Sequence, residues 1–175
     1  MVMRMALVIA LAVAMRSSAA EPAEEYHVKG AFLLNFAKFV EWPAQAFKDA
    51  ASPISICILG ENPFGPGLDN AARQIVADNR PVTVRQVSGP EQAGQCQIVF
   101  VSASEKKRTR KLLEAVQGSS VLTVGESDGF LAGGGVIDFK LEGERVRIEI
   151  STEAADRAKL RISAKLLSLA QSPRK

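Results

Sequence analysis

The stretch Gln97-Ile98-Val99-Phe100-Val101 decides the fold class of this 175-residue chain. Four consecutive apolar residues after Gln97 are typical of a central strand that is covered on both faces of a sheet. The residues that follow, Ser102-Ala103-Ser104-Glu105, match a helix capping box, in which the serine and the glutamate satisfy the first amide groups of a helix. We therefore expect a buried strand followed by a helix over residues 105–116.

The segments on either side of this unit alternate between strand and helix patterns. Val28, Phe32 and Phe36 recur at helical spacing, and Pro43 ends the helix that they predict. The expected strands cover residues 54–59, 81–87, 97–101, 121–124, 136–141 and 145–150, and the expected helices cover 24–42, 68–76, 105–116 and 152–169. This order predicts an α/β sandwich, with a mixed β-sheet flanked by helices on both faces and long N- and C-terminal helices.

The chain has the composition of one ordinary globular domain, with 47% apolar and 23% charged residues. No linker, repeat or low-complexity stretch divides residues 24–171, so we expect a single domain there. A chain of this length buries about two-thirds of its surface on folding. That is enough for a core without a cofactor, and the sequence predicts none.

Residues 1–20 have the pattern of a secretory signal peptide. Arg4 precedes the apolar run from Met5 to Met15, and small residues lead up to a cleavage site near Ala20. The run is too short to span a bilayer, which needs about 20 apolar residues. An uncleaved amphipathic anchor or a core helix is the alternative. We expect an exported, periplasmic protein.

Export would place the two cysteines in an oxidising compartment. Cys57 lies inside the expected strand 54–59, and Cys96 immediately precedes the central strand. In an oxidising compartment an even number of cysteines favours a disulfide. The alternative is two buried, inert thiols in neighbouring strands.

Composition also excludes some classes of function. The chain holds 22 basic and 19 acidic residues, and Arg4 and Arg16 lie in the expected signal peptide, so the remainder is nearly neutral and does not indicate nucleic-acid binding. His27 is the one histidine, which rules out a Cys2His2 zinc site. No pattern places a nucleophile or a carboxylate against it. We expect no catalytic residue and no metal site.

Arg157 and Arg161 are the strongest candidates for ligand binding. On a continuous closing helix they lie one turn apart, where two guanidinium groups could bind a carboxylate or a phosphate. The alternative is local pairing, because Glu153 precedes Arg157 by four residues.

Three other patterns have an ordinary structural explanation beside a functional one. The loop Gly60–Gly67 lacks the residues of a phosphate-binding loop, and the glycines at 133–135 either form an anion-binding nest or permit a tight bend. The basic run Lys106–Lys111 is either a solvated helix face or a surface that attracts anionic lipid or an acidic partner.

The whole chain after the expected signal peptide resembles the YfiR-like periplasmic proteins. Taken singly each matching segment is weak, but together they run in order over about 145 residues, and the ordered set is specific. The segments are Tyr26–Pro43, Ile56–Gly60, Pro63–Gly65, Cys96–Ser102, Val121–Val124, Gly134–Phe139, Arg147–Ile150 and Leu160–Ala170.

The resemblance implies a non-enzymatic α/β regulator in the periplasm. Its best-understood members bind the periplasmic sensor domain of an inner-membrane diguanylate cyclase and hold it inactive, which restrains cyclic-di-GMP output and biofilm formation. It also implies a Cys57–Cys96 pair, a tendency to form homodimers, basic contacts to a small anionic ligand at Arg157 and Arg161, and partner contacts around Glu149. Some relatives carry a second cysteine pair, which this chain lacks.

A second function stays open. The chain could be a periplasmic small-ligand-binding accessory protein of a sensor kinase or a transporter. That alternative predicts a pocket beside Arg161 and a metabolite that copurifies with the protein.

Overall fold

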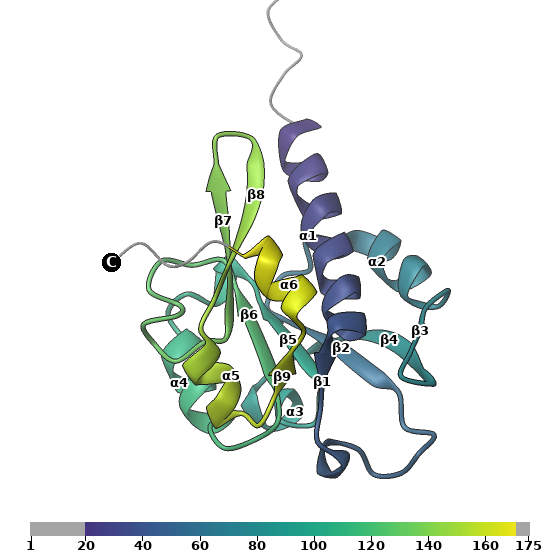
Figure 1. The fold of residues 1–175 in the computed structure, drawn as a ribbon. Coiled ribbons are helices and arrows are strands. Elements are labelled where there is room, and N and C mark those ends of the chain that lie inside the picture. Colours follow the sequence, from purple (N-terminus) through teal and green to yellow (C-terminus); the bar gives the residue numbers. More distant parts are fainter. Residues whose placement is uncertain (1–19, 171–175) are drawn as a thin grey trace, which may run out of the picture.

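A seven-stranded mixed sheet with helices on both faces forms the body of the protein, which a computed structural model describes over residues 20–170 (Figure 1). All but Ala20 of the expected signal peptide lies outside the described residues. Within residues 20–170, no helix is both long enough and apolar enough to cross a membrane. The predicted fold class is confirmed.

The strands of the large sheet follow the order β3-β4-β2-β5-β6-β7-β8. The five inner strands, β4, β2, β5, β6 and β7, run parallel to one another. The edge strand β3 pairs antiparallel with β4, and the edge strand β8 pairs antiparallel with β7. The bounds are β2 (Ile54–Leu59), β3 (Val76–Ala77), β4 (Arg80–Val87), β5 (Ile98–Val101), β6 (Leu122–Gly125), β7 (Ile137–Glu142) and β8 (Arg145–Ile150).

Strand β5 is the central strand that its apolar sequence predicts. It pairs in parallel with β2 on one side and with β6 on the other, and all four of its residues are buried. Ile98 and Phe100 belong to one apolar core, and Val99 and Val101 to a second. Because successive side chains of a strand point to opposite faces, these two cores lie on the two faces of the sheet.

Helices cover both of these faces. Helix α1 packs on the larger core, where the rings of Phe36 and Phe139 stack with centroids 6.1 Å apart. Helix α4 contributes Leu112 and Leu113 to the smaller core. The helices are α1 (Ala20–Phe39), α2 (Gly65–Ala72), α3 (Pro90–Ala93), α4 (Thr109–Ala115), α5 (Thr152–Arg157) and α6 (Ala164–Leu169), with 3-10 turns η1 (Ala44–Ala46) and η2 (Ala103–Glu105).

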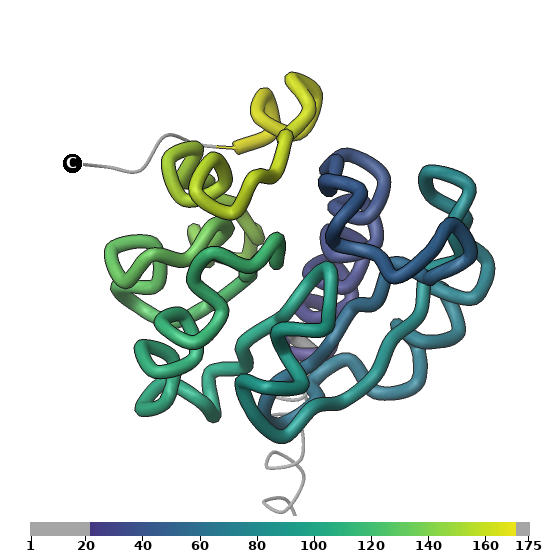
Figure 2. Tube along the Cα trace, turned by 90° about the horizontal axis from the view of Figure 1, so that it is seen from below, coloured from purple at the N-terminus to yellow at the C-terminus, as the bar shows by residue number. Residues whose placement is uncertain are grey.

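Viewed from below the sheet, the chain divides into two halves that lie side by side. Figure 2 shows the first half in blue and teal on one side and the second half in green and yellow on the other. A two-stranded ladder joins the end of α1 to the C-terminal segment, because β1 (Val40–Glu41) pairs antiparallel with β9 (Arg161–Ile162).

The predicted closing helix over 152–169 is wrong. Helix α5 ends at Arg157, and Lys159 adopts a left-handed φ of 57°. The amide of Leu160 then donates to the carbonyl of Ala155 and that of Lys159 to the carbonyl of Asp156, which is a Schellman motif. A glycine usually occupies the left-handed position, so Lys159 gives no stop signal. Strand β9 follows, and Ser163 caps α6 by accepting from the amide of Leu166.

Other boundaries differ by smaller amounts. Helix α1 ends at Phe39 because Val40 and Glu41 pair with β9, and Val28 is exposed rather than part of its buried stripe. The capping box does not form, because Ser102 caps the short turn η2 and Glu105 pairs with Arg108, so helix α4 begins only at Thr109.

The glycines at 133–135 have a packing role. A Cβ atom on Gly135 would overlap the ring of Phe130, and so would one on Gly125 of β6. Gly134 has a φ of 100°, a conformation that favours glycine. The bend lets the backbone close over Phe130, which agrees with the structural explanation.

Candidate functional site

The disulfide between Cys57 and Cys96 lies in the smaller apolar core, on one face of the sheet. Their sulfur atoms are bonded at 2.02 Å with the Cα atoms 6.1 Å apart, and both residues are buried. It ties β2 to the segment before β5 and uses both cysteines of the chain. Nη2 of Arg85 donates a hydrogen bond of 3.4 Å to the sulfur of Cys96. The bond is the one expected for an oxidising compartment.

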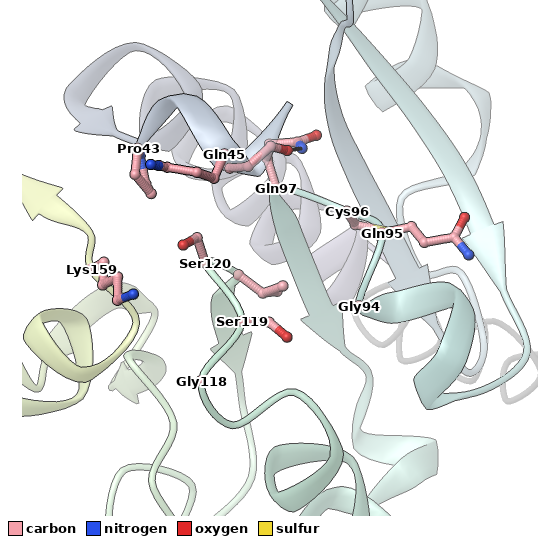
Figure 3. Close-up of a pocket in the computed structure, with 12 residues that line it drawn as sticks. Pro43, Gln45, Gly94, Gln95, Cys96, Gln97, Gly118, Ser119, Ser120 and Lys159 are labelled. Carbon is pink, nitrogen blue, oxygen red and sulfur yellow. Dashed lines mark hydrogen bonds between the residues drawn. The ribbon is translucent and has the colours of Figure 1, made fainter. Parts of the chain in front are cut away.

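A cleft of about 470 Å³ opens beside this disulfide. Figure 3 shows Lys159 and the turn at Ser119 and Ser120 facing Gln45 and Gln97 across it. The lining is Pro43, Gln45, Ala46, Gly94, Gln95, Cys96, Gln97, Gly118, Ser119, Ser120, Val121 and Lys159. Lys159 is its one charged member, so the cleft favours a small anionic or polar molecule.

The amide of Gln97 already has partners inside the protein. It accepts a hydrogen bond from the Ser55 amide at 2.9 Å and donates one to the Ala46 carbonyl at 2.8 Å. Nε1 of Trp42 donates to the Gln97 carbonyl at 3.1 Å. Gln97 therefore fixes the wall of the cleft, and the cation that faces the space is Lys159.

The structure does not place Arg157 and Arg161 on one helix. Arg157 ends α5 and lines a smaller cavity of about 120 Å³, whereas Arg161 begins β9. Nε of Arg161 lies 3.9 Å from a carboxylate oxygen of Glu41, and both side chains are largely exposed. Among the described residues, Glu153 makes no ion pair with Arg157. The predicted geometry is wrong, and an anion-binding role for either arginine stays a prediction.

The β7–β8 hairpin has one apolar and one charged face. Phe139 and Ile148 face the core, whereas Asp138, Lys140, Arg147 and Glu149, here called the hairpin charge group, lie on the other face. Asp138 stands opposite Glu149 in the ladder, and Lys140 stands opposite Arg147. Figure 1 shows this hairpin projecting beyond the rest of the sheet.

The hydrogen-bonding capacity of the hairpin charge group is only partly satisfied. Asp138 is buried; one of its oxygens pairs with Nζ of Lys140 at 2.7 Å, and the other has no hydrogen-bond partner. Burial raises the pKa of Asp138 in spite of that pair, and the nearby charges of Glu149 and Asp128 raise it further.

Arg147 and Glu149 add two more groups without a hydrogen bond. Nε of Arg147 is buried, makes no hydrogen bond, and lies 3.6 Å from a carboxylate oxygen of Glu142. Glu149 is half-buried and makes neither a hydrogen bond nor an ion pair with any described residue. At the tip, Leu141 is 53% exposed. The charged face of the hairpin thus presents a carboxylate and a guanidinium group that a partner could complete, and Leu141 lies on the opposite face.

A second charged cluster, here called the Lys29 group, consists of Lys29, Glu25, Glu126 and Tyr26. Sequence patterns did not predict it. Lys29 is buried; its ammonium group pairs with Glu25 on the same helix and with Glu126, at 2.7 Å, in the segment after β6. Glu126 also accepts from the Ala103 amide and from the hydroxyl of Tyr26. Burial, followed by the charges of Glu126 and Glu25, raises the pKa of Tyr26 to about 12. The available signal was Lys29 lying one turn before Leu33 on the buried side of α1.

The place where α/β proteins usually bind ligands is filled. The chain leaves β2 for β4 and later returns to β5 on the other side, so the carboxyl ends of β2 and β5 flank the topological switch point. There Ser104 accepts a hydrogen bond from the Glu61 amide at 3.0 Å, and a Cβ atom on Gly60 would lie 2.5 Å from the Ser104 hydroxyl. The loop Gly60–Gly67 is a structural turn.

His27 is exposed, and it has no hydrogen bond or ion pair with any residue of the described range. No group of three or more histidine, cysteine or acidic residues in residues 20–170 is arranged to hold a metal ion.

Comparison with known proteins gives one family and several distant folds. A family model described as YfiR/HmsC-like matches residues 26–171. A search of curated proteins gives no match. Two similar solved structures, each 9% identical with a TM-score of 0.50, are a conserved domain protein of Vibrio cholerae and the ABC domain of Streptococcus pneumoniae in complex with L-Trp.

Both of those likenesses are partial. The alignments cover 68% and 67% of this chain, and the chain spans 54% of the length of each solved chain. At this level of identity they show the fold alone.

Proposed function

Because the chain belongs to the YfiR/HmsC-like family, we propose that it is a periplasmic regulator that binds the periplasmic domain of an inner-membrane diguanylate cyclase and holds the enzyme inactive. The family suggests regulation of a diguanylate cyclase in the periplasm, and the disulfide fits an oxidising compartment. Direct binding to the sensor domain, cleavage near Ala20 and assembly into a homodimer are parts of this proposal.

The observation that carries the proposal is the unsatisfied charge on the β7–β8 hairpin. A half-buried carboxylate on Glu149 and a buried Nε on Arg147 lie on a projecting element and have no hydrogen-bond partner in the described chain. A group in that state gains most from a partner, because its partial desolvation has already occurred. We place the cyclase contact on this face of the hairpin.

Inhibition of this kind is a shift of population. The regulator must bind the inactive state of the cyclase more tightly than the active state, and a shift from 1:99 to 99:1 needs about a 10⁴-fold difference in affinity. The proposal assigns no chemical step to the regulator.

The test compares two charge reversals on one hairpin. Glu149→Arg removes the proposed contact, whereas Glu144→Arg makes the same charge change at the exposed turn between β7 and β8. We expect Glu149→Arg to weaken binding of the mature protein to the purified periplasmic domain of the cyclase by tenfold or more, about 1.4 kcal/mol. Glu144→Arg should bind nearly as the wild type does. Equal binding by all three proteins would remove the hairpin from the interface.

Two measurements address the other parts of the proposal. Mass spectrometry of protein isolated from the periplasm should give a mature N-terminus at Glu21. Sedimentation of that material should give a homodimer, and a monomer at all concentrations would contradict this part.

A second candidate function is binding of a small anionic ligand for a sensor kinase or a transporter. The cleft beside Lys159 favours it, because its volume suits a single metabolite. L-tryptophan and inorganic phosphate are suitable probes in calorimetry. Binding that is lost in Lys159→Ala but kept in Lys48→Ala would support this function, and absence of heat with either probe would count against it.

A further inference from the structure

The turn before α4 and the first turn of that helix form an exposed basic surface. Lys106, Lys107, Arg110 and Lys111, here called the basic turn, are all exposed. Thr109, Leu112 and Leu113 are buried, so the helix turns its other side to the core. The cations are thus held at the surface by the packing of α4.

Three of these cations have no partner. Arg110 is paired with Glu114 at 3.3 Å. Lys106, Lys107 and Lys111 make no hydrogen bond or ion pair with any residue of the described range. Every aspartate and glutamate of the chain lies between residues 21 and 156, so the two ends outside the described range supply no acidic side chain.

The basic turn differs from the rest of the described surface in charge. Residues 20–170 hold 18 basic and 19 acidic side chains, whereas residues 105–114 alone hold five basic and two acidic ones. The remaining described residues therefore carry a net charge of −4 beside a local +3. A segregated charge of this kind orients a protein in an electric field.

The shape of the basic turn favours an extended anionic surface over a small anion. None of its four cations lines either of the two cavities described above, so no concave site surrounds an ion there. Lysines on an exposed turn interact as point charges and suit headgroups in a plane better than a single bidentate ligand.

We infer that the basic turn docks the protein onto anionic phospholipid headgroups of the membrane that holds its partner. This rests on the proposed function, which places the partner in a membrane. Figure 1 shows α4 well apart from the tip of the β7–β8 hairpin, so lipid contact leaves the tip accessible. Docking confines the protein near the membrane and raises its effective concentration at the cyclase.

The size of the effect follows from the charge on each lysine. A cation near an anionic membrane surface contributes about fivefold to partitioning, about 1 kcal/mol, and salt screens the attraction within about one Debye length. Reversing two lysines removes two attractions and adds two repulsions. The loss should therefore be about 25-fold or more.

The experiment measures sedimentation of the mature protein with vesicles of phosphatidylcholine, with and without about a third phosphatidylglycerol. We expect binding to the anionic vesicles alone and release by NaCl. Lys106→Glu/Lys107→Glu should lose that binding. The matched control, Lys38→Glu/Lys48→Glu, changes the net charge equally at two other exposed lysines and should keep it.

Each other outcome overturns the inference. Equal loss in both double variants would mean that net charge alone drives binding. Displacement by inorganic phosphate beyond that by NaCl of equal ionic strength would mean a phosphate site. In another outcome, the wild type fails to bind anionic vesicles while Lys106→Glu/Lys107→Glu loses affinity for the purified cyclase domain. That result would mean that the basic turn contacts the cyclase and not the lipid. If cyclase binding is intact and vesicle binding absent, the inference fails and the proposed function stands.

Discussion

Two charged clusters, the Lys29 group and the hairpin charge group, lie close to each other and differ in how fully their members are paired. In the Lys29 group, the ammonium group has two carboxylate partners and Glu126 accepts three hydrogen bonds. In the hairpin charge group, one oxygen of Asp138, Nε of Arg147 and the carboxylate of Glu149 lack hydrogen-bond partners. Asp138 pairs in the ladder with Gly125, the residue before Glu126.

The difference separates a structural role from a binding role. A buried, fully paired cluster fixes α1 to the segments after β5 and β6, and removing one partner leaves an uncompensated buried charge. A cluster with unsatisfied groups on a projecting hairpin contributes less to stability and more to recognition of a partner. We therefore expect substitutions in the Lys29 group to lower the free energy of unfolding. Substitutions of the unpaired residues of the hairpin charge group should instead lower affinity for the partner.

Lys29→Ala should have the largest effect on stability. It leaves Glu126 buried without its cation, which costs about 3–5 kcal/mol of unfolding free energy. Urea denaturation measures the loss, with Lys38→Ala on the exposed side of the same helix as control. A change below about 1 kcal/mol would mean that the Lys29 group does not fix α1.

Titration of Tyr26 tests the same cluster without a substitution. It is the one tyrosine of the chain, so phenolate absorbance reports it alone. The pKa should be about 12 in the folded protein and near 10.0 after unfolding. Because the folded pKa is the higher one, stability is present below the unfolded value and is lost as pH rises through the folded value. A folded midpoint near 10 would show that neither burial nor the carboxylates of Glu126 and Glu25 disfavour the phenolate.

Asp138→Asn should have a smaller effect on the free energy of unfolding than Lys29→Ala, and it should raise that free energy instead of lowering it. Burial raises the pKa of Asp138 in the folded protein, so its contribution is present at low pH and is lost as pH rises through the folded pKa. The variant should therefore gain stability relative to the wild type as pH rises above about 4, the ordinary pKa of the carboxyl group. Denaturation over a series of pH values measures the gain, and a relative loss would mean that the pair with Lys140 outweighs burial.

Glu149→Ala should have the smallest effect on stability. Its carboxylate makes no hydrogen bond or ion pair with a described residue, and its attraction to Lys140 is offset by its repulsion of Asp138, so the unfolding free energy should change by less than about 0.5 kcal/mol while affinity for the cyclase domain falls. A thermal melt measures the stability of the variant, and a binding curve measures its affinity for the cyclase domain. A large loss of stability would place Glu149 with the structural cluster and contradict the comparison.

Local patterns predicted the sheet better than the end of the chain. Four consecutive apolar residues sufficed to place β5 at the centre, because burial on both faces leaves no other environment for them. The closing segment keeps apolar residues at helical spacing, yet Lys159 takes a left-handed conformation and β9 pairs with β1. That pairing joins residues more than a hundred positions apart, which no local pattern reports.

The candidate site divides in the same way. The cysteine pair follows from count and compartment, and the structure contains that bond. The arginine pair depended on one continuous helix and failed with it. The Lys29 group is a contact between α1 and the segment after β6, so its charges become partners only through the tertiary fold.

The central claim is that the protein restrains a cyclase by contact through the hairpin. Its most direct test is the cellular cyclic-di-GMP level in a deletion strain that is complemented with the wild type, Glu144→Arg or Glu149→Arg. We expect the cyclic-di-GMP level to rise on deletion, to return to normal with the wild type or Glu144→Arg, and to stay high with Glu149→Arg at equal periplasmic abundance. An unchanged cyclic-di-GMP level in the deletion strain would mean that the protein does not restrain a cyclase.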